Sequence, residues 1–204
     1  MLAIVNYGVG NLASIFNMLK KIGVESIIAD KPEQIANADK IILPGIGAFD
    51  HCMQQFNQSG LRPLVEEKVF DKKTPVLGVC VGCQMLMESS EEGNEPGLGW
   101  LKGKVVRFKK EQLPQGYKVP HMAWTDVQPV NNAIIYQNIA DPRFYFVHSF
   151  HILADDRSDV TGSSEYGYEF TASVGRDHIQ GVQFHPEKSH KFGMQLYSNY
   201  SKLF

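Results

Sequence analysis

The sequence predicts an α/β protein with a doubly wound, mostly parallel sheet, flanking helices and extra strands in its second half. Over the first 80 residues, short apolar runs alternate with amphipathic helical patterns, which is the order typical of parallel βαβ units. The second half is richer in strand-like runs, and an amphipathic helix closes the chain. The chain has 204 residues without repeats or a linker-like stretch, so we expect one domain over residues 1–204.

The first half is expected to form four strands, and each is followed by helical sequence. The expected strands cover residues 2–6, 26–29, 40–43 and 75–79, and the expected helices cover residues 11–21, 32–36, 48–58 and 61–70. In the first of these helices, apolar residues recur at helical spacing at Leu12, Ile15 and Leu19. The third strand is expected to stop at Pro44-Gly45-Ile46-Gly47.

The second half is expected to add strands and one final helix. The expected strands cover residues 104–108, 127–129, 144–148, 169–174 and 178–184, and the helix covers residues 191–203. Sites in open α/β sheets form at the carboxyl ends of strands. Gly45–Gly47, Cys80 and His185 all follow such ends, so we expect them to meet in space.

Composition excludes several classes of function. Twenty basic and 22 acidic residues give a net charge of −2, which does not support a nucleic-acid partner. No apolar run approaches the ~20 residues that span a bilayer, and the N-terminus is typical of a strand rather than a signal peptide. Three cysteines are too few for a disulfide scaffold, which favours a cytoplasmic setting.

Cys80 lies where an expected buried strand runs into a helix, in Gly78-Val-Cys80-Val-Gly82-Cys83-Gln84. Glycines on both sides permit a sharp turn and a close approach of the backbone to a substrate. N–H groups of the following helix would favour a thiolate and an oxyanion. The pattern is like the Gly-x-Ser-x-Gly elbow with sulfur in place of oxygen.

A histidine and a carboxylate follow a distant strand, in Gln183-Phe-His185-Pro-Glu187. His185 would take the thiol proton and return it to a leaving group, and Glu187 would orient the imidazole. Together with Cys80, this predicts an acyl-transfer enzyme with a cysteine nucleophile.

Other interpretations of these cysteines remain open at this point. Cys80 could be an inert buried thiol, or Cys80 and Cys83 could form a thioredoxin-like redox pair. A milder hypothesis is a reversible disulfide between them that switches an enzyme off. A chain that has lost turnover and acts only as an interaction subunit is a further alternative.

The two motifs resemble those of class I, triad-type glutamine amidotransferases, which have a flavodoxin-like fold. The finer resemblance is to the family of glutaminase subunits of imidazole glycerol phosphate synthase, and it runs from residue 4 to the end. Further motifs carry it: Asn6-Tyr-Gly-Val-Gly-Asn-Leu12, Leu43-Pro-Gly-Ile-Gly-Ala-Phe49, Gly97-Leu-Gly99, Pro120-His-Met-Ala-Trp124, Tyr145-Phe-Val-His-Ser149, Phe170-Thr-Ala172 and Gln183-Phe-His-Pro-Glu-Lys-Ser189.

The resemblance implies a reaction and a set of site residues. Cys80 attacks the side-chain amide of glutamine, His185 protonates the departing ammonia, and water releases glutamate from the thioester. Backbone N–H groups of Val81 and of the loop Gly45, Ile46 and Gly47 would hold the oxyanion. The glutamine would be contacted by Gln84, His148, Ser149 and Phe150.

The resemblance also implies a partner and no metal or organic cofactor. In this family, ammonia passes to a (β/α)8 barrel cyclase subunit of histidine biosynthesis, and both subunits form a heterodimer. Asn11, Met122 and Trp124 would contact that partner. Three residues depart from the family's usual pattern, namely Cys83 for Met, Ala123 for Gly and Phe150 for Tyr. Similar paralogues supply ammonia to amidotransferases that act on sugars of surface polysaccharides, which is the alternative assignment.

Overall fold

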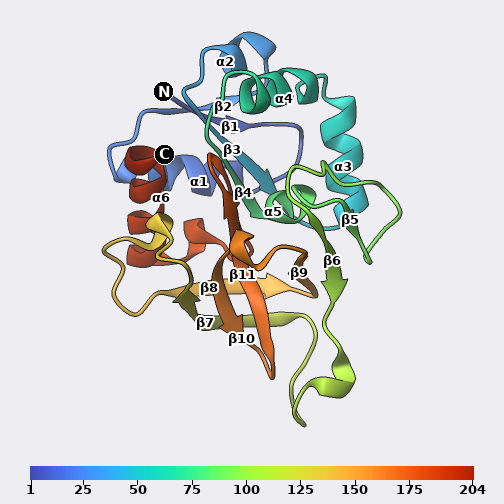
Figure 1. The fold of residues 1–204 in the computed structure, drawn as a ribbon. Coiled ribbons are helices and arrows are strands. Elements are labelled where there is room, and N and C mark those ends of the chain that lie inside the picture. The colour runs from blue at the N-terminus through green and yellow to red at the C-terminus, as the bar shows by residue number, and fades with distance from the viewer.

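The centre of the fold is a parallel sheet of five strands. A computed structural model describes residues 1–204 (Figure 1). The five strands lie in the order β2 (Ser26–Ala29), β1 (Leu2–Val5), β3 (Lys40–Gly45), β4 (Val76–Cys80) and β12 (Ile179–Val182). Every neighbouring pair among them is parallel. This is the strand order of flavodoxin-like folds, so the predicted fold class is confirmed.

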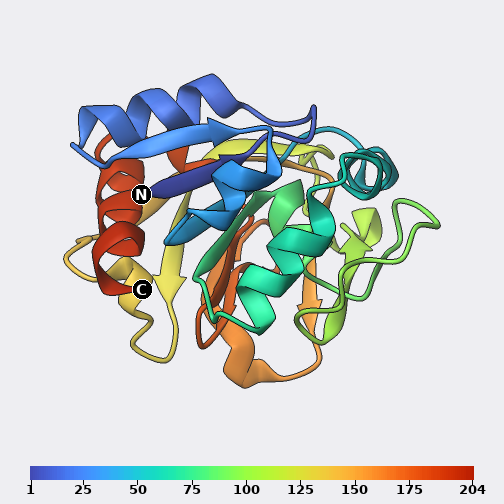
Figure 2. The ribbon, with the colours of Figure 1, turned by 90° about the horizontal axis from the view of Figure 1, so that it is seen from above.

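Helices cover both faces of this sheet (Figure 2). On one face lie α1 (Leu12–Lys21) and α6 (His190–Leu203), and on the other lie α3 (Phe49–Gln58) and α4 (Arg62–Phe70). The short helix α2 (Pro32–Ala36) packs against α4. Because both faces are covered, β1, β4 and β12 are buried along their whole length, which is why their sequences are apolar or contain glycine.

The second half extends the sheet with antiparallel strands beyond β12. The extension follows the order β11 (Glu169–Arg176), β10 (Val160–Glu165), β7 (His121–Pro129) and β8 (Arg143–His148). A branch is formed by β5 (Ser89–Ser90), β6 (Gly103–Arg107) and β9 (Phe150–Ala154), where β9 pairs with both β6 and β11.

Several sequence-based boundaries were wrong in this half. The expected strand 127–129 is the end of β7, which begins at His121. Strands β9 and β10 were missed: β9 follows β8 after a single residue, and β10 has the mostly polar sequence Val-Thr-Gly-Ser-Ser-Glu. In the first half, β3 continues through Pro44 to Gly45 because its register with β4 extends to Cys80.

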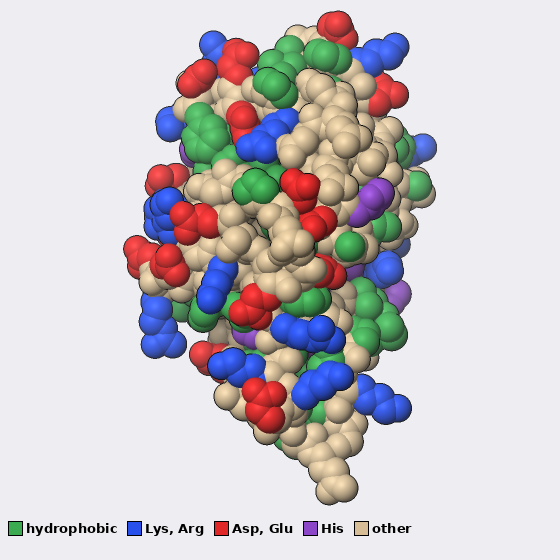
Figure 3. Space-filling view, turned by 90° about the vertical axis from the view of Figure 1, so that its right-hand side faces the viewer, with side chains coloured by type: hydrophobic (Ala, Val, Ile, Leu, Met, Phe, Trp, Pro, Cys, Tyr) green, Lys and Arg blue, Asp and Glu red, His purple; other side chains and the backbone are tan.

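One cluster of 49 buried hydrophobic residues extends through the parallel and the antiparallel strands. The surface carries acidic and basic side chains interspersed, with basic ones gathered near the projecting segment between β6 and β7 (Figure 3). None of the helices has the length and apolar character needed to cross a bilayer.

Candidate active site

Cys80 is the last residue of β4, and the chain turns there directly into the short helix α5 (Val81–Met85). Its backbone has φ 55° and ψ −113°, a region that residues with a side chain rarely adopt. Such strain persists where the surrounding structure enforces it, often at active sites. The predicted elbow is therefore present, with the thiol at the carboxyl end of a central strand.

Two glycines make this elbow possible because the backbone is tightly packed around it. A Cβ atom on Gly82 would lie 2.0 Å from the carbonyl oxygen of Leu43, and one on Gly78 would lie 2.6 Å from that of Gly82. Both distances are far shorter than van der Waals contact. Gly82 is thus required by the close approach of β3 to α5, and Gly78 by the close approach of α5 to β4.

The neighbours of β4 bring the other expected groups to the same end of the sheet. On one side, Gly45 of β3 lies in register with Cys80, which places the loop Gly45–Gly47 beside the thiol. On the other side, His185 follows β12, three residues after that strand ends. The sheet topology therefore brings together segments that are more than 100 residues apart.

His185 and Glu187 form a buried pair next to Cys80. Nδ1 of His185 lies 2.8 Å from Oε1 of Glu187. Burial by itself lowers the pKa of His185, but the charge of Cys80 and hydrogen bonds to Cys80 and Glu187 outweigh burial and raise it to about 10. The structure thus favours an imidazolium between a sulfur and a carboxylate.

Asn11, which was expected at the partner surface, also contacts Glu187. Its Nδ2 atom donates to Oε1 of Glu187 at 3.4 Å. The residue is half-buried, so it connects Glu187 to the molecular surface.

The side-chain amide nitrogen of Gln84 forms hydrogen bonds within the chain. Its Nε2 donates to Oε1 of Gln183 at 2.9 Å and to the carbonyl oxygen of Phe150 at 3.2 Å. Gln183, which is fully buried, directs its own Nε2 toward the sulfur of Cys80 at 3.9 Å. The sequence pattern predicted no role for Gln183, although it belongs to the motif that contains His185.

His148 is also held internally. Its Nδ1 lies 2.7 Å from the carbonyl oxygen of Phe150, and its Nε2 lies 3.1 Å from Nδ1 of His121. Burial lowers the pKa of His121 to about 4 and that of His148 well below its usual value. With both ring nitrogens occupied, His148 forms a neutral wall of the site and has no free nitrogen for a substrate.

A cavity of about 380 Å³ opens at this end of the sheet, a size within the usual range of small-molecule sites. It is lined by Ile46, Gly47, Cys80, Val81, Gln84, Glu92, Pro120, Val147, His148, Ser149, Phe150, His185 and Lys188. All the expected substrate and oxyanion residues except Gly45 are among them. Glu92 and Lys188 were missed, because an exposed charged residue carries no distinguishing pattern in a single sequence.

Two of the three residues expected at a partner surface, Met122 and Trp124, lie on β7, whereas Asn11 directly precedes α1. Met122 is 61 % exposed and Trp124 is 36 % exposed. The Trp124 ring stacks on His190, the first residue of α6, with 5.5 Å between ring centroids. This contact fixes the orientation of the indole at the surface.

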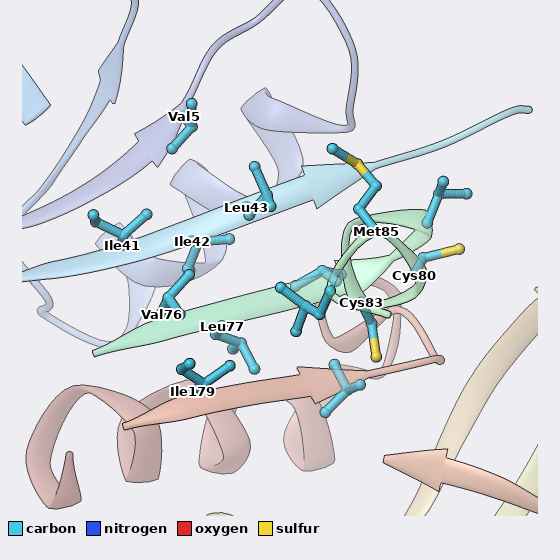
Figure 4. Packing of buried hydrophobic residues seen from close by; sticks show 14 of the residues in the cluster. Val5, Ile41, Ile42, Leu43, Val76, Leu77, Cys80, Cys83, Met85 and Ile179 are labelled. Atoms are coloured by element: carbon cyan, nitrogen blue, oxygen red, sulfur yellow. The ribbon is translucent and has the colours of Figure 1, made fainter. Parts of the chain in front are cut away.

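The two sulfurs of the C-x-x-C sequence point in different directions (Figure 4). Cys83 is fully buried and packs against β12, where a Cβ on Gly181 would lie 2.5 Å from its sulfur. Cys80 points away from that strand (Figure 4). This arrangement argues against a redox pair or a disulfide between them, because a disulfide needs Cβ vectors that converge.

Comparisons with known proteins agree with this geometry. Residues 3–200 match the family described as glutamine amidotransferase class-I. The chain is 50% identical to imidazole glycerol phosphate synthase subunit HisH 2 of Pseudomonas aeruginosa, and 45% identical to subunit HisH of Bdellovibrio bacteriovorus. Both alignments cover 100% of this chain and of the relative.

Solved structures confirm the fold. A crystal structure described as a glutamine amidotransferase superposes with a TM-score of 0.76 at 18% identity, covering 99% of this chain and 97% of that one. Another, described as a glutamine amidotransferase from Thermotoga maritima, superposes with a TM-score of 0.64 at 18% identity, covering 99% of this chain and 82% of that one. By its sequence over almost its full length, the chain belongs to the class-I glutamine amidotransferase family, within the group of HisH subunits of imidazole glycerol phosphate synthase.

Proposed function

We propose that this chain is the glutaminase subunit of imidazole glycerol phosphate synthase. It hydrolyses glutamine to glutamate and ammonia, and the ammonia passes to a cyclase subunit in histidine biosynthesis. The observation that carries the proposal is one cavity lined by both Cys80 and His185, in a chain that matches HisH relatives from end to end.

The reaction uses Cys80, His185 and Glu187 in sequence. The thiolate of Cys80 attacks the side-chain carbonyl carbon of glutamine, and a tetrahedral oxyanion forms. His185 gives its proton to the amide nitrogen, which leaves as ammonia and yields a thioester. His185 then takes a proton from water, which attacks the thioester and releases glutamate. Glu187 holds the imidazole so that its other nitrogen faces the sulfur.

Backbone N–H groups stabilise the oxyanion. The candidates are Val81, at the start of α5, and the loop Gly45–Gly47, whose Ile46 and Gly47 line the cavity. The N–H groups of Ile46 and Gly47 donate to no other group of the chain, so they are available to a substrate. Fixed donors aimed at a charge that develops in the transition state are among the strongest contributions to catalysis.

The ends of the substrate suit two charged residues of the cavity. Glutamine carries an α-ammonium and an α-carboxylate group, and Glu92 and Lys188 supply the complementary charges. Oε2 of Glu92 accepts a hydrogen bond from the backbone N–H of Phe49 at 3.0 Å, which fixes the carboxylate and leaves its other oxygen for the α-ammonium. These contacts favour free glutamine over an amide without charged ends.

Two observations support a cyclase subunit as the partner: the HisH relatives, and the exposed residues beside the cavity. A synthase subunit must dock where ammonia leaves, and Met122 and Trp124 provide an apolar surface on the strand whose first residue follows the cavity residue Pro120. Aromatic residues and methionine are enriched in such interfaces.

The decisive experiment measures glutamate release by the purified chain, alone and with the cyclase subunit of the same genome and its ribonucleotide substrate. Cys80→Ala is the matched control and should release no glutamate in either case. Strong stimulation by the loaded cyclase supports the proposal. Hydrolysis without stimulation would move the partner to a sugar amidotransferase, and a wild-type chain that never hydrolyses glutamine would overturn the proposal.

A further inference from the structure

Cys52 is a buried nucleophilic group that the proposed reaction does not use. It lies in α3, is fully buried and does not line the cavity. Its sulfur lies 3.2 Å from the carbonyl oxygen of Ile46. Burial is the main cause that raises the pKa of Cys52 to about 11, so the thiol keeps its proton and donates to that oxygen. A side chain in the core therefore holds a carbonyl of the loop Gly45–Gly47.

This hydrogen bond fixes the orientation of the peptide between Ile46 and Gly47. The peptide is trans, since the chain's cis bond lies between Val119 and Pro120. In a trans peptide, the C=O and the N–H point to opposite sides. With the Ile46 carbonyl turned toward Cys52 in the core, the N–H of Gly47 points to the other side of the loop, where Ile46 and Gly47 line the cavity.

A second side chain holds the same loop from the core. The hydroxyl of Tyr7 donates to the carbonyl oxygen of Pro44, and the Tyr7 ring packs on Phe56 of α3 with 5.3 Å between ring centroids. The carbonyls of Pro44 and Ile46, on either side of Gly45, are thus both anchored on the core side. The Gly47 end of the loop depends on Cys52, because Gly47 has φ 81° and no side chain that restricts its rotation.

We propose that Cys52 is a positioning residue for glutamine hydrolysis: its thiol keeps the Ile46 carbonyl turned into the core, so that the loop presents N–H groups to the oxyanion. Without this donor, the Ile46–Gly47 peptide is free to turn over. The Ile46 carbonyl would then face the developing negative charge and repel it. The inference rests on the proposed glutaminase function and adds a residue that acts through the loop, without touching the substrate.

The test compares variants that keep or remove the hydrogen-bond donor at position 52. Cys52→Ala and Cys52→Val remove it with a smaller and a larger apolar side chain, and Cys52→Ser keeps it as a hydroxyl. Cys83→Ala is the matched control, because Cys83 is equally buried and makes no hydrogen bond to the loop. Urea unfolding of each variant identifies those that fold, and the pair of apolar variants keeps the test available if one of them does not.

Two readouts separate positioning from packing. The first is kcat and KM for glutamine hydrolysis with the cyclase subunit present. The second is the rate at which iodoacetamide alkylates Cys80, followed by mass spectrometry, because alkylation at a saturated carbon forms no oxyanion.

We expect Cys52→Ala and Cys52→Val to lower kcat about tenfold or more, with KM and the alkylation rate changed less than about twofold. Cys52→Ser should recover most of the activity, and Cys83→Ala should retain it. An unchanged kcat, an equal loss in the serine variant, or a parallel fall in alkylation would overturn the inference while the glutaminase function stands. A wild-type chain without glutaminase activity would overturn both.

Discussion

The imidazole of His185 and the carboxylate of Glu187 lie 2.8 Å apart and are both buried. Only one residue separates them in the chain, and the proline between them starts a single turn of 3-10 helix. The short turn lets both side chains point to the same place, so that the carboxylate orients the ring that faces Cys80.

Replacing this carboxylate should weaken the base without removing it. In Glu187→Gln, we expect the pKa of His185 to fall, because the charge of Glu187 is one of the groups that raise it. We expect kcat for glutamine hydrolysis to fall by about tenfold or more, and by less than in His185→Gln, since orientation is secondary to proton transfer. Imidazole NMR titration and steady-state kinetics measure both effects. An equal or larger loss in Glu187→Gln would contradict the assigned roles.

The raised pKa of His185 predicts how stability changes with pH. The folded value of about 10 lies above the value near 6.5 of an unfolded histidine. The stabilisation is therefore fully present below about pH 6.5 and is lost as the pH rises through about 10, by a few kcal/mol. The charge of Cys80 contributes to the shift, so urea unfolding of Cys80→Ala should show a smaller loss between pH 7 and 10. Equal losses in both proteins would refute this coupling.

The strained backbone at Cys80 predicts that glycine at this position gives a more stable protein than alanine. At φ 55° and ψ −113°, glycine is tolerated and alanine is strained. We expect Cys80→Gly to be more stable than Cys80→Ala by about 1 kcal/mol, as measured by urea unfolding, and both to release no glutamate. If Cys80→Ala is as stable as Cys80→Gly, the elbow stores no strain.

The charge of Glu92 should determine how tightly glutamine binds. Glu92→Gln keeps an oxygen for the N–H of Phe49 but loses the charge for the α-ammonium. We expect KM for glutamine to rise by about tenfold with little change in kcat, because the contact exists in both ground and transition states. Glu95→Gln changes a half-buried neighbour outside the cavity and should leave KM unaltered. A fall in kcat at constant KM would assign Glu92 a different role.

The surface of β7 should affect only the partner. In Trp124→Ala, we expect the affinity for the cyclase subunit to fall about tenfold or more, as measured by titration calorimetry, with basal glutamate release retained. Leu153→Ala removes another exposed apolar side chain, on β9, and serves as the control. Loss of affinity in the control alone would place the interface elsewhere.

Sequence periodicity was sufficient for the first half of the fold. Strands β1, β2 and β4 and helices α1 to α4 lie within a residue or two of their expected bounds, because apolar runs and helical spacing report local burial. The antiparallel half was harder, since β10 is mostly polar and is stabilised by its neighbours β11 and β7. Such a strand depends on pairing partners that are distant in the chain, and a local pattern does not record them.

The sequence by itself determined which reactive groups each segment carries. One segment has a cysteine between two glycines, and another has a histidine separated by one residue from a carboxylate. It also determined that these segments follow strands, which brings them to one edge of a parallel sheet. Only the tertiary structure decided which polar groups remain available there. The amide nitrogen of Gln84 and both ring nitrogens of His148 are used by internal hydrogen bonds, whereas Glu92 and Lys188 reach the cavity. The physical reason is that a hydrogen bond depends on the distance and direction between atoms, which packing sets and residue order does not.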